Sequence, residues 1–430
     1  MVRLGFSAHP GCGEMRLRDR AIVSLALRHG VEVVYRESPH CLFTPRAVIK
    51  ASGGFPPLTF KRFLGVVQSL PIPTIPIPVP ESDIVMTSVS EDHDETPVNE
   101  ILLKKELDEF PWAGGETEAR ARFHRALKNW RLNKTQMTPD LRDVTPYIVQ
   151  GCLSVRQVFH DVNMVYHEIH GEKPTLKLHF AALHRDFLYC LSAVPVSEKL
   201  NLDIPFEKNE KLTAAWLTGN TGYPWVDAVM RQMKTEGWAA PLLRQSALWF
   251  LTRGVLWQDP SVGIEFLSEH CLFDLPLARG LTNWAAGIGS WIEGEVAHKC
   301  PKLHPNFIRK WVPETAEMTD EQLAEPWKVE KPNKKYRMAL PHKQSHRQAQ
   351  AKYQDSLKSS SNKLLSKLDR IGKSGKRVQP IVLEPSPWEL VQPCPNSYLN
   401  HAGLTGISGD IAHQTFLQYM QKQQVKIHLD

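Results

Sequence analysis

The segment from Trp216 to Trp257 constrains the fold of this chain more than any other part of the sequence. It reads WLTGNTGYPWVDAVMRQMKTEGWAAPLLRQSALWFLTRGVLW. A Gly/Thr turn and a Tyr-Pro-Trp entry therefore lead into two Trp-rich runs with helical spacing. Large aromatic side chains contribute to folding mainly through burial. The residues that we expect in the core of a helical domain are Trp216, Trp225, Trp238 and Trp257.

Helical patterns predominate from residue 116 to residue 312, whereas the N-terminal part of the chain is mixed. Residues 17–36 read as a helix that Gly30 ends, followed by the β-rich run Val31 to Tyr35. Units of this kind build parallel sheets. Residues 44–70 predict two short helices around a Gly-Gly-Phe-Pro-Pro turn, and residues 71–80 predict a Pro-rich extended connection.

Several short motifs, in one order along the chain, resemble the cryptochrome/DNA photolyase family, of the animal cryptochrome and six-four photolyase type. They are RHGVEVVYRESPHCLFTPRAVIKASGGFPPLTFKRF (28–63), WAGGETEARARF (112–123), TPYIVQGCLSVRQVF (145–159), LHRDFLYCLSA (183–193) and HPNFIRKWVPE (304–314). Agreement of many motifs is far more specific than any single match. The resemblance implies an α/β plus all-α fold class: a partial Rossmann-like parallel α/β domain, followed by a helical photolyase-type FAD-binding domain.

The resemblance divides the chain into four expected parts. These are a partial photolyase-like α/β domain (1–80), an acidic interdomain linker (81–111), a helical FAD-binding-type domain (112–330) and a basic, partly disordered C-terminal tail (331–430). In the family, further strands and helices precede the segment that begins here at residue 17. We therefore expect a truncated N-terminal domain, either reduced or an incomplete gene product, whose sheet would have an unpaired edge.

The resemblance also implies a flavin site, built from Thr145, Arg185, Arg244 and Asp274. Thr145 is the one hydroxyl left in the loop 141–146, which in the family holds the FAD diphosphate at a helix N-terminus. Arg244 corresponds to an arginine near the isoalloxazine, and Asp274 is its expected ion-pair partner. The alternative is that these two residues form a structural ion pair only.

Several neighbouring positions depart from the family pattern, so we expect the flavin site to be eroded and FAD to be weakly bound or absent. In the WREF-like motif around Arg185, the flanking Trp and Glu are His184 and Asp186, and an upstream Gln or Glu is Ala181. The Asn that faces flavin N5 is Ala278, or Arg279 if the register shifts by one residue.

We predict no catalytic residues. The lesion-pocket positions of six-four photolyases hold Ala240, Pro241 and Gln245, and general acid catalysis needs a proton donor that Ala and Pro lack. The three Trp positions of the family's electron relay hold Phe206, Pro260 and Thr282, although Trp249 and Trp291 offer another route. His298, Cys300 and His304 have zinc-like spacing, but without further Cys we predict no metal site.

The net charge of +6 is distributed unevenly along the chain. Residues 331–380 contain ten Lys and four Arg against two Asp, a net charge of +12, so the remainder carries −6. DNA is a possible partner, and any electrostatic attraction to it would be concentrated in the tail. Residues 344–371 predict a basic amphipathic helix that docks on a partner, docks on the core or stays solvated.

No signal-peptide core and no run of roughly 20 apolar residues occurs in the sequence, and its seven Cys are scattered. We expect a nuclear or cytoplasmic protein with no membrane partner. The working hypothesis is a cryptochrome-like regulator in blue-light or circadian signalling, which contacts regulatory proteins through the helical domain and tail. The alternatives are an FAD-dependent DNA photolyase that repairs pyrimidine lesions and a truncated, inactive family member.

Overall fold

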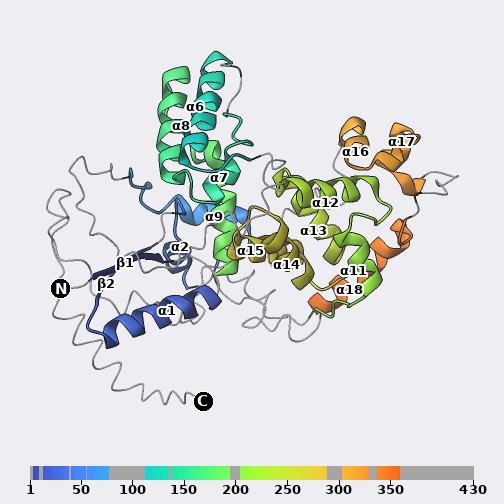
Figure 1. The fold of residues 1–430 in the computed structure, drawn as a ribbon, viewed down its shortest axis with the longest axis horizontal. Coiled ribbons are helices and arrows are strands. Elements are labelled where there is room, and N and C mark those ends of the chain that lie inside the picture. The colour runs from blue at the N-terminus through green and yellow to red at the C-terminus, as the bar shows by residue number, and fades with distance from the viewer. Residues whose placement is uncertain are drawn as a thin grey trace, which may run out of the picture.

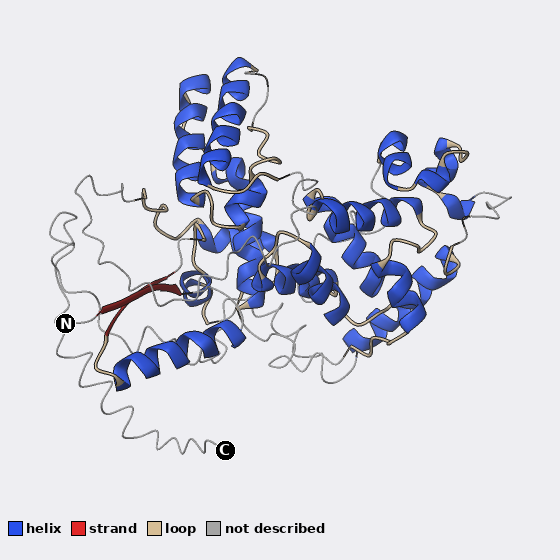
Figure 2. Cartoon of the chain, in the orientation of Figure 1, coloured by secondary structure: helices blue, strands red, loops and turns tan. Residues whose placement is uncertain are grey.

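The computed structural model describes residues 3–8, 13–37, 40–54, 56–76, 112–133, 135, 138–193, 204–287, 303–328, 336 and 338–358. Helices make up most of this part of the chain, and its two strands form one small sheet (Figure 2). The predicted linker 81–111 and the tail after residue 358 lie outside the described residues, so predictions about them stay predictions.

The N-terminal unit consists of strand β1 (Arg3–Ala8), helix α1 (Gly13–Arg28) and strand β2 (Glu32–Glu37). The strands pair in parallel, with Arg3 opposite Glu32 and Ala8 opposite Glu37. The predicted helix–strand unit is confirmed, and Gly30 follows α1 with a left-handed φ of 69°. Sequence analysis missed β1. The part of the expected Rossmann-like domain that the described residues show is this β-α-β unit.

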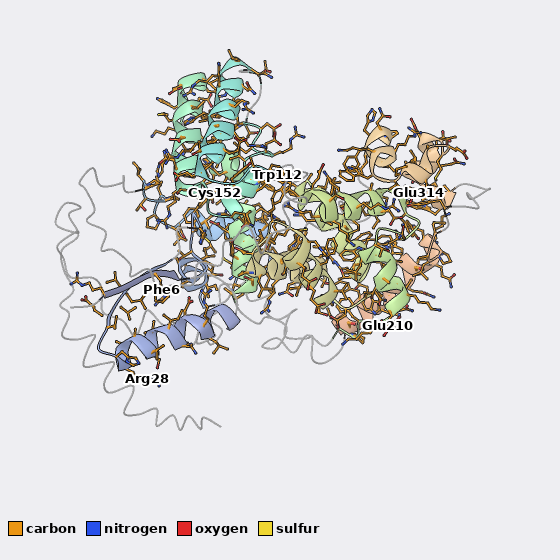
Figure 3. The ribbon with its side chains drawn as sticks, in the orientation of Figure 1. Phe6, Arg28, Trp112, Cys152, Glu210 and Glu314 are labelled. Atoms are coloured by element: carbon orange, nitrogen blue, oxygen red, sulfur yellow. The ribbon has the colours of Figure 1, made fainter. Side chains whose placement is uncertain are left out.

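A small core of its own holds the N-terminal unit together. Val23 and Ala26 of α1 and Val33 of β2 are buried there, and Leu4 and Phe6 of β1 pack against them. The unit lies to one side of the helical body, as the positions of Phe6 and Arg28 relative to Trp112, Glu210 and Glu314 show (Figure 3).

Two short helices connect this unit to the helical body, as predicted. Helix α2 (Pro45–Ala51) begins after Thr44, whose hydroxyl caps it, and α3 (Phe60–Val67) begins after Thr59 in the same way. Phe60 and Phe63 of α3 pack edge-on against Phe187 of the body, with ring centroids 5.7 and 5.8 Å away.

The first part of the body contains α6 (Glu116–Leu132), α7 (Thr145–Val149), α8 (Val155–His170), the 3-10 helix η1 (Leu176–His179) and α9 (Phe180–Ser192). Helices α6 and α8 lie side by side, and α9 runs through the middle of the molecule (Figure 1). Helix α8 shows why the prediction succeeded here: Ser154 caps its start, Gly171 ends it with a φ of 69°, and its buried residues recur at helical spacing.

The second part contains α11 (Glu210–Leu217), α12 (Pro224–Glu236), α13 (Pro241–Trp249), the π-helix η2 (Phe250–Gly254), α14 (Ser261–His270) and α15 (Leu275–Ala285). Helices α15 and α9 approach closely because α15 has Gly280 at the crossing, where a Cβ would lie 2.1 Å from the carbonyl oxygen of Leu188. The four Trp predicted for the core are confirmed as buried.

The last part contains α16 (Pro305–Trp311), η3 (Pro313–Thr315), α17 (Asp320–Ala324), η4 (Pro326–Lys328) and α18 (His342–Lys358). Helix α18 overlaps the amphipathic helix predicted for the tail, and it packs on the core. His346 Nδ1 lies 2.8 Å from the Gly254 carbonyl oxygen, and the Tyr353 hydroxyl donates to Gly287 O at 3.1 Å. No helix among the described ranges is both long and apolar enough to cross a membrane.

Candidate functional site

Helices α9 and α15 bring two of the four predicted site residues together. Tyr189 lies one turn after Arg185 on α9, and the Arg185 guanidinium carbon is 5.8 Å from the centre of the Tyr189 ring. The Tyr189 hydroxyl donates to Asp274, which also caps α15 by accepting the Leu277 N–H at 2.9 Å. Tyr189 therefore links Arg185 to Asp274.

Arg185 and its neighbour Asp186 bind the main chain of the segment that precedes α2. Arg185 donates to the His40 carbonyl oxygen, and Asp186 Oδ2 accepts the Phe43 N–H at 2.9 Å. Both side chains are buried, and the closest distance between their charged groups is 3.8 Å. These bonds join α9 to that segment, while Arg185 Nε and Asp186 Oδ1 are buried without a hydrogen-bond partner.

Burial dominates the electrostatics of this cluster. It raises the pKa of Asp186 to about 7, against the opposing effects of Arg185 and of the amides of Phe43 and Leu42. The pKa of the buried Cys41 thiol is likewise raised, by burial and then by Asp186. A buried thiol whose pKa is raised is unreactive.

Arg244, on α13, lies in an aromatic environment. Its guanidinium carbon is 4.1 Å from the centre of the Trp238 ring and 4.5 Å from that of Phe273, and the group donates to Ala239 O at 2.9 Å. Its Nε is buried without a hydrogen-bond partner, and burial lowers the pKa of Arg244 to about 9. A buried cation held by two rings and one carbonyl is therefore present.

The expected ion pair between Arg244 and Asp274 is not formed, and that prediction was wrong. The guanidinium lies between two rings, whereas the carboxylate accepts from Tyr189 and caps α15. The competing donors were not visible in the sequence, since Tyr189 and Asp274 are 85 positions apart.

His184, which stands where the family motif has Trp, is part of an aromatic cluster. Its ring centroid lies 5.4 Å from that of Phe60, 6.0 Å from that of Phe180 and 5.8 Å from that of Trp284. Burial, and then the charge of Arg244, lowers the pKa of His184 to about 4. The ring therefore stays neutral near pH 7 and takes the place of an aromatic side chain.

Thr145 lies at the start of α7, in the loop that the resemblance assigns to a diphosphate. Its hydroxyl donates to Leu141 O at 2.8 Å. Arg142 in the same loop forms a bidentate pair with Asp140, at 2.6 Å for the closest atoms. A cavity of about 150 Å³ lies beside the loop, lined among others by Arg122 and Arg125 of α6 and by Asp140 and Asp143. Its walls carry charges of both signs.

The positions that departed from the family pattern have structural environments of their own. The Phe206 and Trp257 ring centroids are 4.8 Å apart, and the buried Thr282 hydroxyl donates to Ala278 O at 2.8 Å. His304 caps α16, and no group of three potential metal ligands occurs among the described residues. His298, Cys300 and Trp291 lie outside those residues.

Sequence reasoning missed the carboxylate that organises the Thr221–Gly222 turn. Asp227 accepts the Thr221 N–H at 2.8 Å, the Thr221 hydroxyl at 2.6 Å and the Gly222 N–H at 3.0 Å, and it also accepts from Tyr336. The available signal was an Asp six residues after Thr221 of the Gly-Asn-Thr-Gly turn.

The overall arrangement has clear relatives. Residues 176–358 match the family model described as the FAD binding domain of DNA photolyase. Cryptochrome-1 of Mus musculus is 32% identical over 349 residues, which cover 72% of this chain and 56% of the mouse protein. The chain belongs to the cryptochrome/photolyase family. Another cryptochrome, Cryptochrome-2 of Gallus gallus, is 30% identical over 345 residues, again 72% of this chain and 58% of the relative. The chain thus spans little more than half the length of these relatives.

Solved structures of cryptochromes and photolyases share the fold. A bacterial class III photolyase from Agrobacterium tumefaciens aligns with a TM-score of 0.64 at 19% identity, over 83% of this chain and 80% of that one. A Synechocystis cryptochrome aligns with a TM-score of 0.58 at 20% identity, over 81% and 78%. At sequence identities of 19% and 20%, these structures show that the fold is shared and nothing further.

The site described above departs from the flavin site that the cryptochrome/photolyase resemblance implies. A diphosphate needs hydroxyl and N–H donors and positive charge. The Thr145 hydroxyl instead donates within its own loop, Arg142 is paired with Asp140, and Asp143 adds a second carboxylate. These residues do not fit a diphosphate. Arg185 and Arg244 each have a buried Nε without a hydrogen-bond partner, so these two predicted residues still have a donor available.

Proposed function

We propose that this cryptochrome/photolyase family chain is a regulator in blue-light or circadian signalling, which acts through protein contacts in the nucleus or cytoplasm with FAD binding weakened or lost. The observation that carries the proposal is the internal bonding of the predicted flavin residues. Thr145, Arg185 and Asp274 all direct polar groups to protein atoms.

The energetic reason is that a cofactor must replace the hydrogen bonds that the site residues already make to protein atoms. A buried donor or acceptor that loses its partner costs about 1–3 kcal/mol. Withdrawing Asp274 from Tyr189, or Arg185 from His40, would incur that cost before any flavin contact forms. The family fold, without a ready set of cofactor contacts, still offers a large helical surface and a cationic tail for proteins.

The alternative function is that of an FAD-dependent, blue-light DNA photolyase. Arg244 favours it, since a buried guanidinium with an unbonded Nε is suited to a cofactor. Against it stand Ala240 and Pro241, which offer no side-chain proton donor at the lesion-pocket positions.

A repair assay separates the two functions. The purified chain, incubated with FAD and reductant, is mixed with oligonucleotides that carry one cyclobutane pyrimidine dimer or one six-four lesion, under blue light and in the dark. We expect equal lesion content in both samples. Light-dependent loss of either lesion would overturn the regulator proposal in favour of the photolyase. Cooperative thermal unfolding of the same sample shows that the chain is folded, which excludes an unfolded product as the cause.

A further inference from the structure

The cavity beside the loop that precedes α7 has charged residues of both signs on its walls. Helix α6 contributes Arg122, Arg125 and Asn129, whose spacing of three and four residues places them on one face of the helix. The loop contributes Asp140 and Asp143. Side-chain donors therefore line the cavity from the helix, and carboxylates line it from the loop.

Two of these four charges are already balanced within the protein. Arg122 donates to Glu118 at 2.6 Å, and Asp140 is held in the bidentate pair described above. The other two side chains, Arg125 and Asp143, are exposed and form no hydrogen bond or ion pair with any of the described residues, including each other. One positive and one negative group in the same cavity thus remain available to a ligand.

The size and the remaining lining of the cavity limit what can bind there. About 150 Å³ holds roughly five to ten non-hydrogen atoms, at about 15–30 Å³ each. Sites for drug-sized ligands and cofactors start at roughly 300 Å³. The rest of the lining is apolar and consists of the buried Trp130 and Val144 and the half-buried Ala126. The ligand that fits is therefore small and charged, with a short apolar part.

We propose that this cavity binds a small zwitterion of the α-amino acid class. The ligand carboxylate accepts from the Arg125 guanidinium and the Asn129 amide, and the ligand ammonium donates to Asp143. A simple anion such as phosphate would also meet the two carboxylates, and a simple cation would meet the two guanidinium groups. A ligand that carries both charges satisfies the two available groups and adds no net charge to the cavity.

This inference concerns a small ligand and is independent of the proposed regulatory function. Its experiment uses the purified full-length chain at pH 7, in the dark and without flavin, so its failure would say nothing of repair or of protein partners. The chain is titrated with glycine, alanine and serine, and binding is measured by saturation-transfer NMR. Three further probes each lack one feature of alanine: propionate has no ammonium, alaninamide has no carboxylate, and inorganic phosphate has no positive charge.

We expect saturable binding of at least one of the three amino acids, with a Kd on the order of 1 mM, and binding of the other probes at least about tenfold weaker. Arg125→Gln and Asp143→Asn should each weaken amino-acid binding about tenfold or more, because one ligand charge then lacks its partner. The matched controls are Lys128→Gln on α6 and Glu265→Gln on α14, which remove exposed charges outside the cavity. They should bind as the unmodified chain does. Thermal unfolding of each variant shows that it is folded, and either cavity variant suffices for the test.

Three results would overturn the proposal. The first is the absence of saturable binding by all three amino acids. The second is propionate, alaninamide or phosphate binding as tightly as alanine, because a single charge would then suffice. The third is binding that Arg125→Gln and Asp143→Asn leave unchanged, or that either control weakens equally, because the amino acid would then bind elsewhere on the chain.

Discussion

Asp186 on α9 accepts the backbone N–H of Phe43 at 2.9 Å, which joins the central helix of the body to a segment 143 positions earlier in the chain. Arg185 donates to His40 O from the adjacent position, so two consecutive side chains hold the segment that leads into α2. The residues that the family resemblance assigned to a flavin environment thus connect the N-terminal segments to the helical body.

The pH dependence of stability tests this contact through Asp186→Asn. Burial raises the pKa of Asp186 to about 7 from 3.8, so the native state binds the proton more tightly than the unfolded chain does. That contribution to the free energy of unfolding is present at low pH and is lost as pH rises from about 4 to about 7. The variant should lack this loss, an effect on the order of a few kcal/mol. The free energy of unfolding is measured by urea denaturation at several pH values between 4 and 7. If it changes with pH equally in both proteins, Asp186 is not buried as described.

His184 should act in the opposite direction. Burial lowers its pKa to about 4 from 6.5, so its contribution is present above pH 6.5 and is lost as pH falls toward 4. His184→Phe keeps an aromatic ring among Phe60, Phe180 and Trp284 and removes the titrating group. The variant should therefore gain stability relative to the unmodified chain below pH 6. The control is His124→Gln, at an exposed histidine, which should leave the pH dependence of the free energy of unfolding unchanged. If His184→Phe has the same pH dependence as the unmodified chain, the lowered pKa of His184 is refuted.

Arg244 should be replaceable by a neutral side chain of similar length. A buried charge with no carboxylate partner among the described residues carries a desolvation cost, so replacing it with an apolar side chain of similar length should not destabilise the fold. We expect Arg244→Met to match or exceed the stability of the original chain in urea unfolding. Arg244→Ala, which also leaves a cavity between Trp238 and Phe273, should be less stable than the Met variant. A Met variant several kcal/mol less stable would mean that the guanidinium itself stabilises the fold.

The contact between α9 and α15 should depend on Gly280. A Cβ at this position would lie 2.1 Å from Leu188 O, so the helices would have to separate. We expect Gly280→Ala to lower the free energy of unfolding by about 2–4 kcal/mol. Gly65 in α3 is the matched control, because a Cβ there meets nothing within 4 Å. Gly65→Ala should be neutral or slightly stabilising through helix propensity, by up to about 1 kcal/mol. Equal effects of the two substitutions would contradict the close packing.

Most of the fold could be predicted from patterns among neighbouring residues, but little of the candidate site could. Helix starts such as Thr44 and Ser154, stops such as Gly30 and Gly171, and the spacing of buried Trp are written in neighbouring residues. Strand β1 was missed because RLGFSA is short and contains Gly5. Its parallel pairing with β2 is a contact across α1 that a local pattern does not show.

The site partners are contacts between distant segments. Tyr336 meets Asp227 across 109 positions, and Arg185 meets His40 across 145. The family resemblance identified the site residues. It could not show which partners Asp274 and Arg244 would have, because these depend on the donors and aromatic rings that the tertiary fold places beside them.

The most direct test of the account is the visible absorption spectrum of the purified chain after incubation with excess FAD and removal of unbound cofactor. Because Thr145, Arg185 and Asp274 are bonded within the protein, we predict far less than one flavin per chain, with no change under blue light. Stoichiometric flavin absorbance that bleaches reversibly under blue light would contradict the account.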